Sequence, residues 1–266
     1  MKLSFLFLFV TAFLMSMTTM NATPELLTSP KSKILVCGGA MMNGNHFADS
    51  VIPAMSEFYA GTKHVAIILH ASVPADRDKM ERRLKEAFEH IGVEKGTSLH
   101  RLDGQGAIAL LKEVDAIFIS GGDTFALLKE LQKTGQLEVI QKRALAGIVT
   151  GGTSAGANVL GPVIGTTNDF PVNDIPTRNA LSLFPALINP HHPKPEDESS
   201  YASREWKINN YRRWNPGETV LALGDRSIAV LKDGKVTLPL GPAWLYAADG
   251  SRALESGDTI QELDTK

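Results

Sequence analysis

Cysteine is almost absent from the 266-residue chain, and several other features are missing with it. Cys37 is the only cysteine, so an intramolecular disulfide is excluded, and its apolar neighbours predict a buried core position. No cluster of histidine, carboxylate or cysteine has the spacing of metal ligands, so we expect neither a metal nor another cofactor. The net charge of -2 and the lack of a basic run argue against a nucleic-acid partner.

The first 22 residues differ in composition from the rest. Lys2 gives a short positive start, residues 3–15 are almost entirely apolar, and Ala22 places a small residue at a cleavage position. The apolar run is short for a membrane span, and no cysteine follows it to carry a lipid anchor. We expect a secretory signal peptide over residues 1–22, export to the periplasm or medium, and no membrane attachment after cleavage. An uncleaved N-terminal anchor is the alternative.

After residue 30, short apolar runs alternate with amphipathic stretches. Runs bare of polar residues, separated by helices, predict an α/β fold with a mostly parallel sheet covered by helices on both faces. The composition is that of an ordinary globular protein, and we expect one domain over residues 23–266. The expected strands lie at 34–38, 65–69, 116–119, 148–150 and 187–190, and the expected helices at 79–91 and 125–131.

The last quarter of the chain predicts antiparallel strands. Short apolar runs lie at 220–223, 227–231 and 236–240, and Asp233-Gly234 between the last two is a strong hairpin signal. We expect these strands to form an antiparallel edge of the main sheet or a small flanking sheet. The charged, proline-containing segment 191–200 is predicted to be a loop.

The chemistry-bearing pattern is the sequence of residues 152–156, Gly-Thr-Ser-Ala-Gly, which fits a nucleophile elbow. In such an elbow a strained strand-to-helix turn exposes the serine, here Ser154, and the next N–H, that of Ala155, faces the developing oxyanion. Gly122, at the end of a neighbouring strand, is expected to supply the second N–H. A plain glycine turn or a phosphate cradle is the alternative, although no lysine follows the glycines as in a P-loop.

A serine nucleophile needs a base, and a carboxylate to orient that base. Of seven histidines, His191 follows an apolar run into a loop after the elbow, and we choose it as the base. Asp169 and Asp225 are the two candidates for the carboxylate, and spacing alone does not decide between them.

Four stretches in order resemble the aspartyl dipeptidases (peptidase E) and, more distantly, the cyanophycinases. They are residues 121–128, 154–158, 166–171 and 181–191, within a similarity that spans roughly residues 33 to 258. The resemblance implies a class I glutamine-amidotransferase-like fold, Ser154 as nucleophile and His191 as base. It also raises the preference for Asp169 as the third member, because the family usually has glutamate at position 225.

The resemblance further implies a serine exopeptidase that cleaves dipeptides after an N-terminal aspartate. Arg178 and Arg204 are candidate partners for the aspartyl carboxylate, and Asn168 for the substrate's free amine. His192 stands where the family has phenylalanine, and no arginines follow the base as they do in cyanophycinases. A cyanophycinase-like or isoaspartyl peptidase and a catalytically silent binding protein are the rival functions. We expect a small peptide as the partner, and a homodimer stays open.

Overall fold

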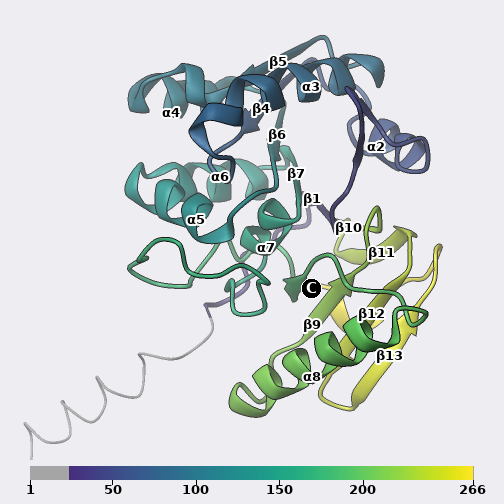
Figure 1. The fold of residues 1–266 in the computed structure, drawn as a ribbon. Coiled ribbons are helices and arrows are strands. Elements are labelled where there is room, and N and C mark those ends of the chain that lie inside the picture. The colour runs from purple at the N-terminus through teal and green to yellow at the C-terminus, as the bar shows by residue number, and fades with distance from the viewer. Residues whose placement is uncertain (1–23, 266) are drawn as a thin grey trace, which may run out of the picture.

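The computed structural model describes residues 24–265 (Figure 1). The predicted signal peptide over residues 1–22 lies outside them. None of the helices in the described part of the chain is both long enough and apolar enough to cross a membrane.

A seven-stranded sheet forms the centre of the molecule, in the order β11-β10-β1-β7-β6-β4-β5 (Figure 1). The five strands from β1 to β5 in that order are parallel, whereas β10 and β11 are antiparallel. The predicted mostly parallel α/β fold is therefore confirmed. The strands are β1 (Lys33–Cys37), β4 (His64–Ile68), β5 (Lys95–Ser98), β6 (Ala116–Ile119), β7 (Val149–Thr153), β10 (Ile228–Lys232) and β11 (Lys235–Leu240).

Helices cover both faces of this sheet because its inner strands are apolar on both sides. Leu35 and Cys37 of β1 pack in one cluster with residues of α2 and α3, whereas Ile34 and Val36 pack with residues of α4 to α7. Cys37 is buried, as predicted. The helices are α2 (Ile52–Phe58), α3 (Arg77–His90), α4 (Gly104–Glu113), α5 (Thr124–Lys133), α6 (Gln136–Leu145) and α7 (Ala155–Leu160).

A second, four-stranded sheet has the order β13-β12-β9-β8, with only β8 and β9 parallel. Both arrangements predicted for the C-terminal strands therefore occur: β10 and β11 extend the main sheet, whereas β9, β12 and β13 belong to a flanking sheet. Asp233 and Gly234 both have positive φ, 53° and 75°, in the hairpin between β10 and β11. The strands are β8 (Leu187–Asn189), β9 (Val220–Leu223), β12 (Ala243–Ala247) and β13 (Gly250–Leu254).

Helix α8 (Glu198–Trp214) covers one face of the flanking sheet, and its start corrects the predicted loop over 191–200. The side chain of Asp197 caps the helix by accepting from the N–H of Ser200. Only Ile208 of this helix is buried, so the sequence lacks the apolar period that would have indicated it.

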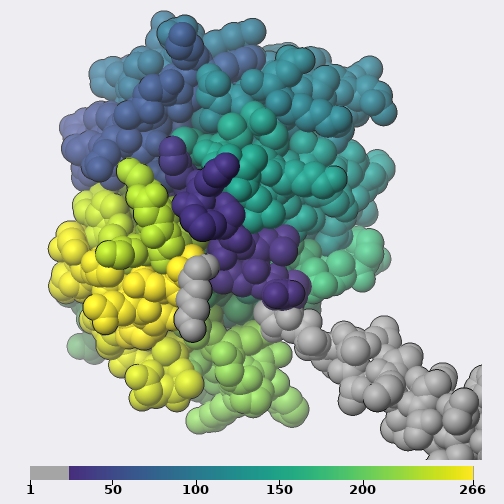
Figure 2. Space-filling view, turned by 180° about the vertical axis from the view of Figure 1, so that it is seen from behind, coloured from purple at the N-terminus to yellow at the C-terminus, as the bar shows by residue number. Residues whose placement is uncertain are grey.

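The described N-terminal segment lies between the α5–α6 side of the molecule and the C-terminal strands, as the view from behind shows (Figure 2). The N–H of Leu27 donates to Ser182 O, and Ser29 Oγ donates to Leu145 O. The remaining short elements are β2 (Met42–Asn43), β3 (His46–Phe47), η1 (Pro74–Asp76), η2 (Leu99–Arg101) and η3 (Gln261–Leu263).

Candidate active site

Three adjacent parallel strands, β1, β7 and β6, each end in a pair of glycines or a glycine-rich turn. Ligands of open α/β sheets bind at the carboxyl ends of the strands, where these turns meet. Glycines there allow the backbone of one turn to approach the next. A β-carbon on Gly156 would stand 2.0 Å from Ile119 O, and one on Gly152 would stand 2.4 Å from Gly156 O.

Ser154 occupies the turn between β7 and α7 with φ 53° and ψ -115°, a conformation that side-chain-bearing residues rarely adopt. Its N–H donates to Cys37 O at 3.0 Å, which ties the turn to β1. Strain of this kind in a strand-to-helix turn is what a nucleophile elbow requires. The side chain is thereby presented at the edge of the sheet.

His191 follows β8 and brings its Nε2 atom to 2.9 Å from Ser154 Oγ. The backbone N–H of His191 donates to Gly38 O at 2.9 Å, so the residue after β1 fixes its position. His191 itself has φ 54°. The structure therefore brings together the serine and the histidine that the sequence analysis selected.

The carboxylate beside His191 belongs to Asp225, whose Oδ1 lies 2.6 Å from Nδ1. This corrects the preference for Asp169. The link between β9 and β10 carries Asp225 to the imidazole, although the side chain is shorter than the glutamate usual at this position. Ser154, His191 and Asp225 thus form one continuous chain of hydrogen bonds.

Asp169 instead binds the start of helix α5. Its Oδ2 atom accepts from the N–H of Thr124 at 2.9 Å and from Thr124 Oγ1 at 2.5 Å. The hydroxyl of Thr167 lies 3.2 Å from the same oxygen. Asp169 therefore anchors the turn that contains Gly122.

Two backbone N–H groups in the turns beside Ser154 make no backbone hydrogen bond among the described residues. Gly122 (φ 135°) has no backbone acceptor for its N–H within the described chain, and Ala155, as the first residue of α7, has none inside its helix. A β-carbon on the adjacent Gly121 would stand 3.0 Å from Ser154 Cβ, so the two turns are in contact. The role of these two N–H groups as the pair of oxyanion donors stays a prediction.

The three predicted substrate-binding residues have different surroundings. Arg204 lies beside His191, where its Nη1 donates to Asn189 Oδ1 and to the carbonyls of Pro190 and His191. Asn168 is engaged at both ends, donating to Pro190 O and accepting from Asn189 Nδ2. Asn168 therefore supports the segment that carries the base, and its role toward the substrate's amine stays a prediction.

Arg178 is exposed, and the contacts of its segment lie away from Ser154. Its carbonyl accepts from the N–H of Ile164, and its charge acts on Tyr211 of α8. The structure does not bring it to the predicted catalytic residues. Of the two arginines considered, only Arg204 adjoins the base.

His192 is buried next to the base and stacks on Trp244, with ring centroids 4.3 Å apart. Its ring nitrogens lie 2.9 Å from Pro193 O and 3.2 Å from the hydroxyl of Tyr246. Burial lowers the pKa of His192 from 6.5 to about 4, and the bond to Pro193 opposes that shift. His192 is therefore a neutral core residue, and His191 is the imidazole that contacts Ser154.

A cavity of about 350 Å³ opens beside Ser154 and His191, between the segment after β1 and helix α3. Arg83 lines this cavity but was not predicted, because a lone arginine on a helix carries no signal in the sequence. Gly38 and Gly39, which contact His191, were not predicted either. A signal was present for them, since two glycines directly after a buried strand repeat the pattern at 121–122. The other lining residues are Ala40, Met41, Met42, Phe47, Met80, Leu84, Phe118, Ser120, Gly121, Gly122 and Thr153.

A larger hollow, of about 430 Å³, lies between the segment from Pro24 to Leu27 and helices α5 and α6. Its lining contains no histidine and therefore no pair of nucleophile and base. The smaller cavity is the candidate active site, because the side chains that line a pocket indicate its function better than its volume does.

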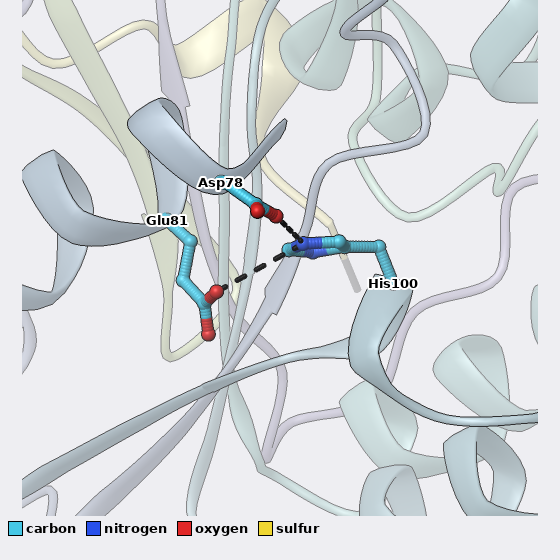
Figure 3. Close-up of side chains that lie close together, drawn as sticks. All are labelled: Asp78, Glu81 and His100. Carbon is cyan, nitrogen blue, oxygen red and sulfur yellow. Dashed lines mark hydrogen bonds and ion pairs between the residues drawn. The ribbon is translucent and has the colours of Figure 1, made fainter. Parts of the chain in front are cut away.

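A separate cluster joins Asp78, Glu81 and His100 (Figure 3). His100 Nε2 lies 3.0 Å from Asp78 Oδ1 and 3.9 Å from Glu81 Oε2. Arg101 already pairs with both carboxylates, at 3.0 Å and 2.7 Å. Arg101 therefore links the two carboxylates, and the ion pairs of the cluster hold η2 against α3.

Comparison with known proteins finds a family and relatives that match most of the chain. Residues 34–239 match the model of peptidase family S51. Peptidase E of Actinobacillus pleuropneumoniae serotype 5b (strain L20) is 32% identical over 206 residues, covering 74% of this chain and 87% of the relative. Peptidase E of Haemophilus influenzae (strain ATCC 51907 / DSM 11121 / KW20 / Rd) is 31% identical over 204 residues, covering 76% and 92%.

Solved structures show the same fold. A putative peptidase E protein from Listeria monocytogenes EGD-e superposes with a TM-score of 0.61 at 21% identity, covering 78% of this chain and 97% of its own. A peptidase from an acI-B1 Actinobacterium superposes with a TM-score of 0.65 at 16% identity, covering 86% and 96%.

Proposed function

The chain is a serine-type peptidase of family S51, and we propose that it hydrolyses dipeptides after an N-terminal aspartate through an acyl-enzyme on Ser154. The observation that carries the mechanism is the chain of hydrogen bonds from Ser154 Oγ through His191 to Asp225. Nucleophile, base and orienting carboxylate stand in the order that acyl transfer requires.

In the proposed reaction, His191 Nε2 takes the proton of Ser154 as Oγ attacks the scissile carbonyl carbon. Asp225 fixes the tautomer with the proton on Nδ1 and stabilises the imidazolium that forms. The same imidazolium then protonates the leaving amine as the C–N bond breaks. Water, deprotonated by His191, then attacks the ester carbonyl carbon. His191 returns that proton to Ser154 Oγ as the ester C–O bond breaks and aspartate is released.

The N–H groups of Gly122 and Ala155 hold the oxyanion in this scheme. Oxyanion donors are worth about a hundredfold to a thousandfold in kcat each, because they act on charge that develops only in the transition state. Asp169 supports one of them by holding Thr124, two residues after Gly122.

Arg204 is the proposed partner of the substrate's aspartyl carboxylate. It is half-buried beside His191, and its other two guanidinium nitrogens, Nε and Nη2, have no hydrogen-bond acceptor among the described residues. An arginine held in place through one nitrogen can bind a carboxylate with the rest of its planar group. The relatives named Peptidase E agree with the resemblance to the aspartyl dipeptidases on which the proposed substrate class rests.

The test compares the α-linked Asp-Leu dipeptide, its β-linked isomer and Ala-Leu as substrates of the protein and of its Ser154→Ala variant. We expect turnover of α-linked Asp-Leu alone, and its loss in Ser154→Ala. Ser251→Ala, an exposed serine on β13, is the matched control and should keep full activity.

Turnover of the β-linked isomer alone, or of a β-linked Asp-Arg dipeptide, would move the protein to the isoaspartyl or cyanophycinase-like class. A serine-directed phosphonate provides a check that does not depend on substrate. Failure of the folded protein to label at Ser154 would support the silent binding protein instead.

A further inference from the structure

We propose that Arg83 and the methionine-rich wall of the cavity bind the leaving residue of the substrate. In this scheme Arg83 pairs with the C-terminal carboxylate of that residue, and the apolar wall receives its side chain. The inference rests on the proposed function, since it assigns the second half of the dipeptide.

The wall that faces away from the sheet is apolar and adaptable. Met41 and Met42 come from the segment after β1, and Met80 comes from helix α3. Phe47 and Leu84, both buried, complete it. Methionine side chains are unbranched and polarizable, so such a surface accepts several large apolar shapes rather than a single one. The expected occupant is a side chain of the leucine, methionine or phenylalanine type.

Arg83 places a positive charge at this wall without a matching acid. Its Nε donates to Gly44 O at 2.7 Å, which holds the side chain in place. No carboxylate within residues 24–265 lies at ion-pair distance from its guanidinium, in contrast to Arg101 and Arg252. A half-buried arginine without a partner beside a nucleophile is suited to an anionic group of the substrate.

The position of His191 decides which end of the dipeptide enters this cavity. The base must deliver its proton to the leaving amine, so the leaving residue lies on the imidazole side of Ser154. The segment that carries Met41 and Met42 begins at Gly38, which binds the N–H of His191, and Gly39 touches the imidazole. The cavity is therefore continuous with the leaving-group side.

A charge placed one residue beyond the scissile bond would limit the substrate length. A dipeptide puts its terminal carboxylate at Arg83, whereas an amide or a longer peptide offers a neutral group there. Arg83, a residue outside the triad, would in this way restrict the enzyme to dipeptides.

The experiment measures kcat and KM for Asp-Leu and for its C-terminal amide with the protein, Arg83→Gln, Arg83→Lys and Arg82→Gln. Arg82 is the neighbouring exposed arginine on α3 and serves as the control. We expect the protein to prefer the acid by at least about tenfold in kcat/KM, because a charge-assisted pair is lost in the amide. Arg83→Gln should remove this preference by lowering kcat/KM for the acid alone, mainly through KM. Arg83→Lys should keep part of it.

A second series uses Asp-Leu, Asp-Met, Asp-Gly and Asp-Lys with Met80→Ala. We expect Asp-Leu and Asp-Met to be preferred over the other two, and the preference over Asp-Gly to shrink by about threefold to tenfold in the variant. An unchanged ratio in Met80→Ala would overturn the apolar half of the proposal.

Equal losses for acid and amide in Arg83→Gln would overturn the carboxylate assignment. A loss of discrimination between Asp-Leu and Asn-Leu would overturn it too, because Arg83 would then bind the aspartyl side chain. If the protein cleaves Ala-Leu or β-linked Asp-Leu instead, the proposed specificity for α-aspartate fails, yet the acid-to-amide ratio measured on that substrate still tests Arg83. Failure to cleave any dipeptide would overturn both proposals.

Discussion

Gly39 lies so close to His191 that a β-carbon on the glycine would stand 2.1 Å from Cε1 of the imidazole and 2.7 Å from either ring nitrogen. Gly39 also has φ 132°, a value that side-chain-bearing residues rarely adopt. The backbone after β1 therefore packs directly against the imidazole. Only glycine at this position lets His191 come within hydrogen-bond distance of Ser154.

Gly39→Ala should lower kcat by at least about a hundredfold, since a displacement of about 1 Å at a catalytic group has effects of that size. Steady-state kinetics on Asp-Leu measures the loss, and circular dichroism confirms the fold. Gly61→Ala is the control: Gly61 also has positive φ, but a β-carbon there would meet nothing within 4 Å. A fully active Gly39→Ala would mean that the imidazole tolerates a shift away from this backbone.

Asp225→Asn should reduce kcat by about a thousandfold or more, because the amide favours the wrong imidazole tautomer. Asp169→Asn should cost about tenfold, through a looser turn at Gly122, and Thr124→Val should resemble it. Kinetics on Asp-Leu with the three variants checks the order. A larger loss in Asp169→Asn than in Asp225→Asn would contradict the assignment of Asp225 as the partner of His191.

The buried His192 should make folding stability depend on pH between about 4 and 6.5. Burial lowers its pKa from 6.5 to about 4, so in this window the unfolded chain binds a proton that the folded chain does not. Stability should therefore fall as the pH drops from 6.5 to 4, and this group should add no further dependence below 4. The loss is at most about 3.5 kcal/mol, since 6.5 and 4 differ by 2.5 and one pKa unit corresponds to about 1.4 kcal/mol.

His192→Phe, which keeps an aromatic ring on Trp244, should remove this part of the pH dependence. Urea unfolding at pH 7 and pH 4.5 measures it in both proteins. The same difference between the two pH values in protein and variant would show that His192 is protonated in the fold.

Gly156→Ala should destabilise the fold by about 1 to 3 kcal/mol, because its β-carbon would meet Ile119 O and force α7 away from β6. Gly104→Ala, at the start of α4 and in open space, should instead stabilise by a few tenths to about 1 kcal/mol. Thermal and urea unfolding of both variants shows whether each substitution lowers or raises the free energy of unfolding. A neutral Gly156→Ala would show that α7 can move without cost.

Export should shorten the chain by its first 22 residues, as the charged start and apolar run of that segment predict. Mass spectrometry of the protein recovered outside the cytoplasm should give Thr23 as the first residue. Recovery of the whole chain from the membrane fraction would favour the uncleaved anchor.

The sequence was sufficient for six of the seven strands of the main sheet, because strands such as Ala116–Ile119 are buried on both faces and therefore apolar without interruption. Strand β5 (Lys95–Ser98) at the edge of the sheet has the sequence KGTS, which lacks an apolar run, and was missed. It also indicated Ser154, whose turn needs small neighbours. Helix α8 was missed for the opposite reason: its exposed surface dominates, and Ile208 is its single buried residue.

The partner of His191 could not be chosen from the sequence, because Asp169 and Asp225 both follow the elbow and both end up near the site. Which aspartate contacts the imidazole depends on how the flanking sheet packs against the main sheet. No local sequence pattern indicates that packing. Arg83 could not be identified for a similar reason, since what distinguishes it is the absence of an acidic neighbour in the described fold.

Asp225 stands on the short link between β9 of the flanking sheet and β10 of the main sheet. Ser154 belongs to the main sheet, whereas His191 follows a strand of the flanking sheet. The three side chains align only while the two sheets are packed together. Ser154 therefore has its base and carboxylate only after the C-terminal part of the chain has folded. A chain that lacked the part after residue 160 would carry the elbow without the base or its carboxylate, and we expect it to be inactive even toward a dipeptide.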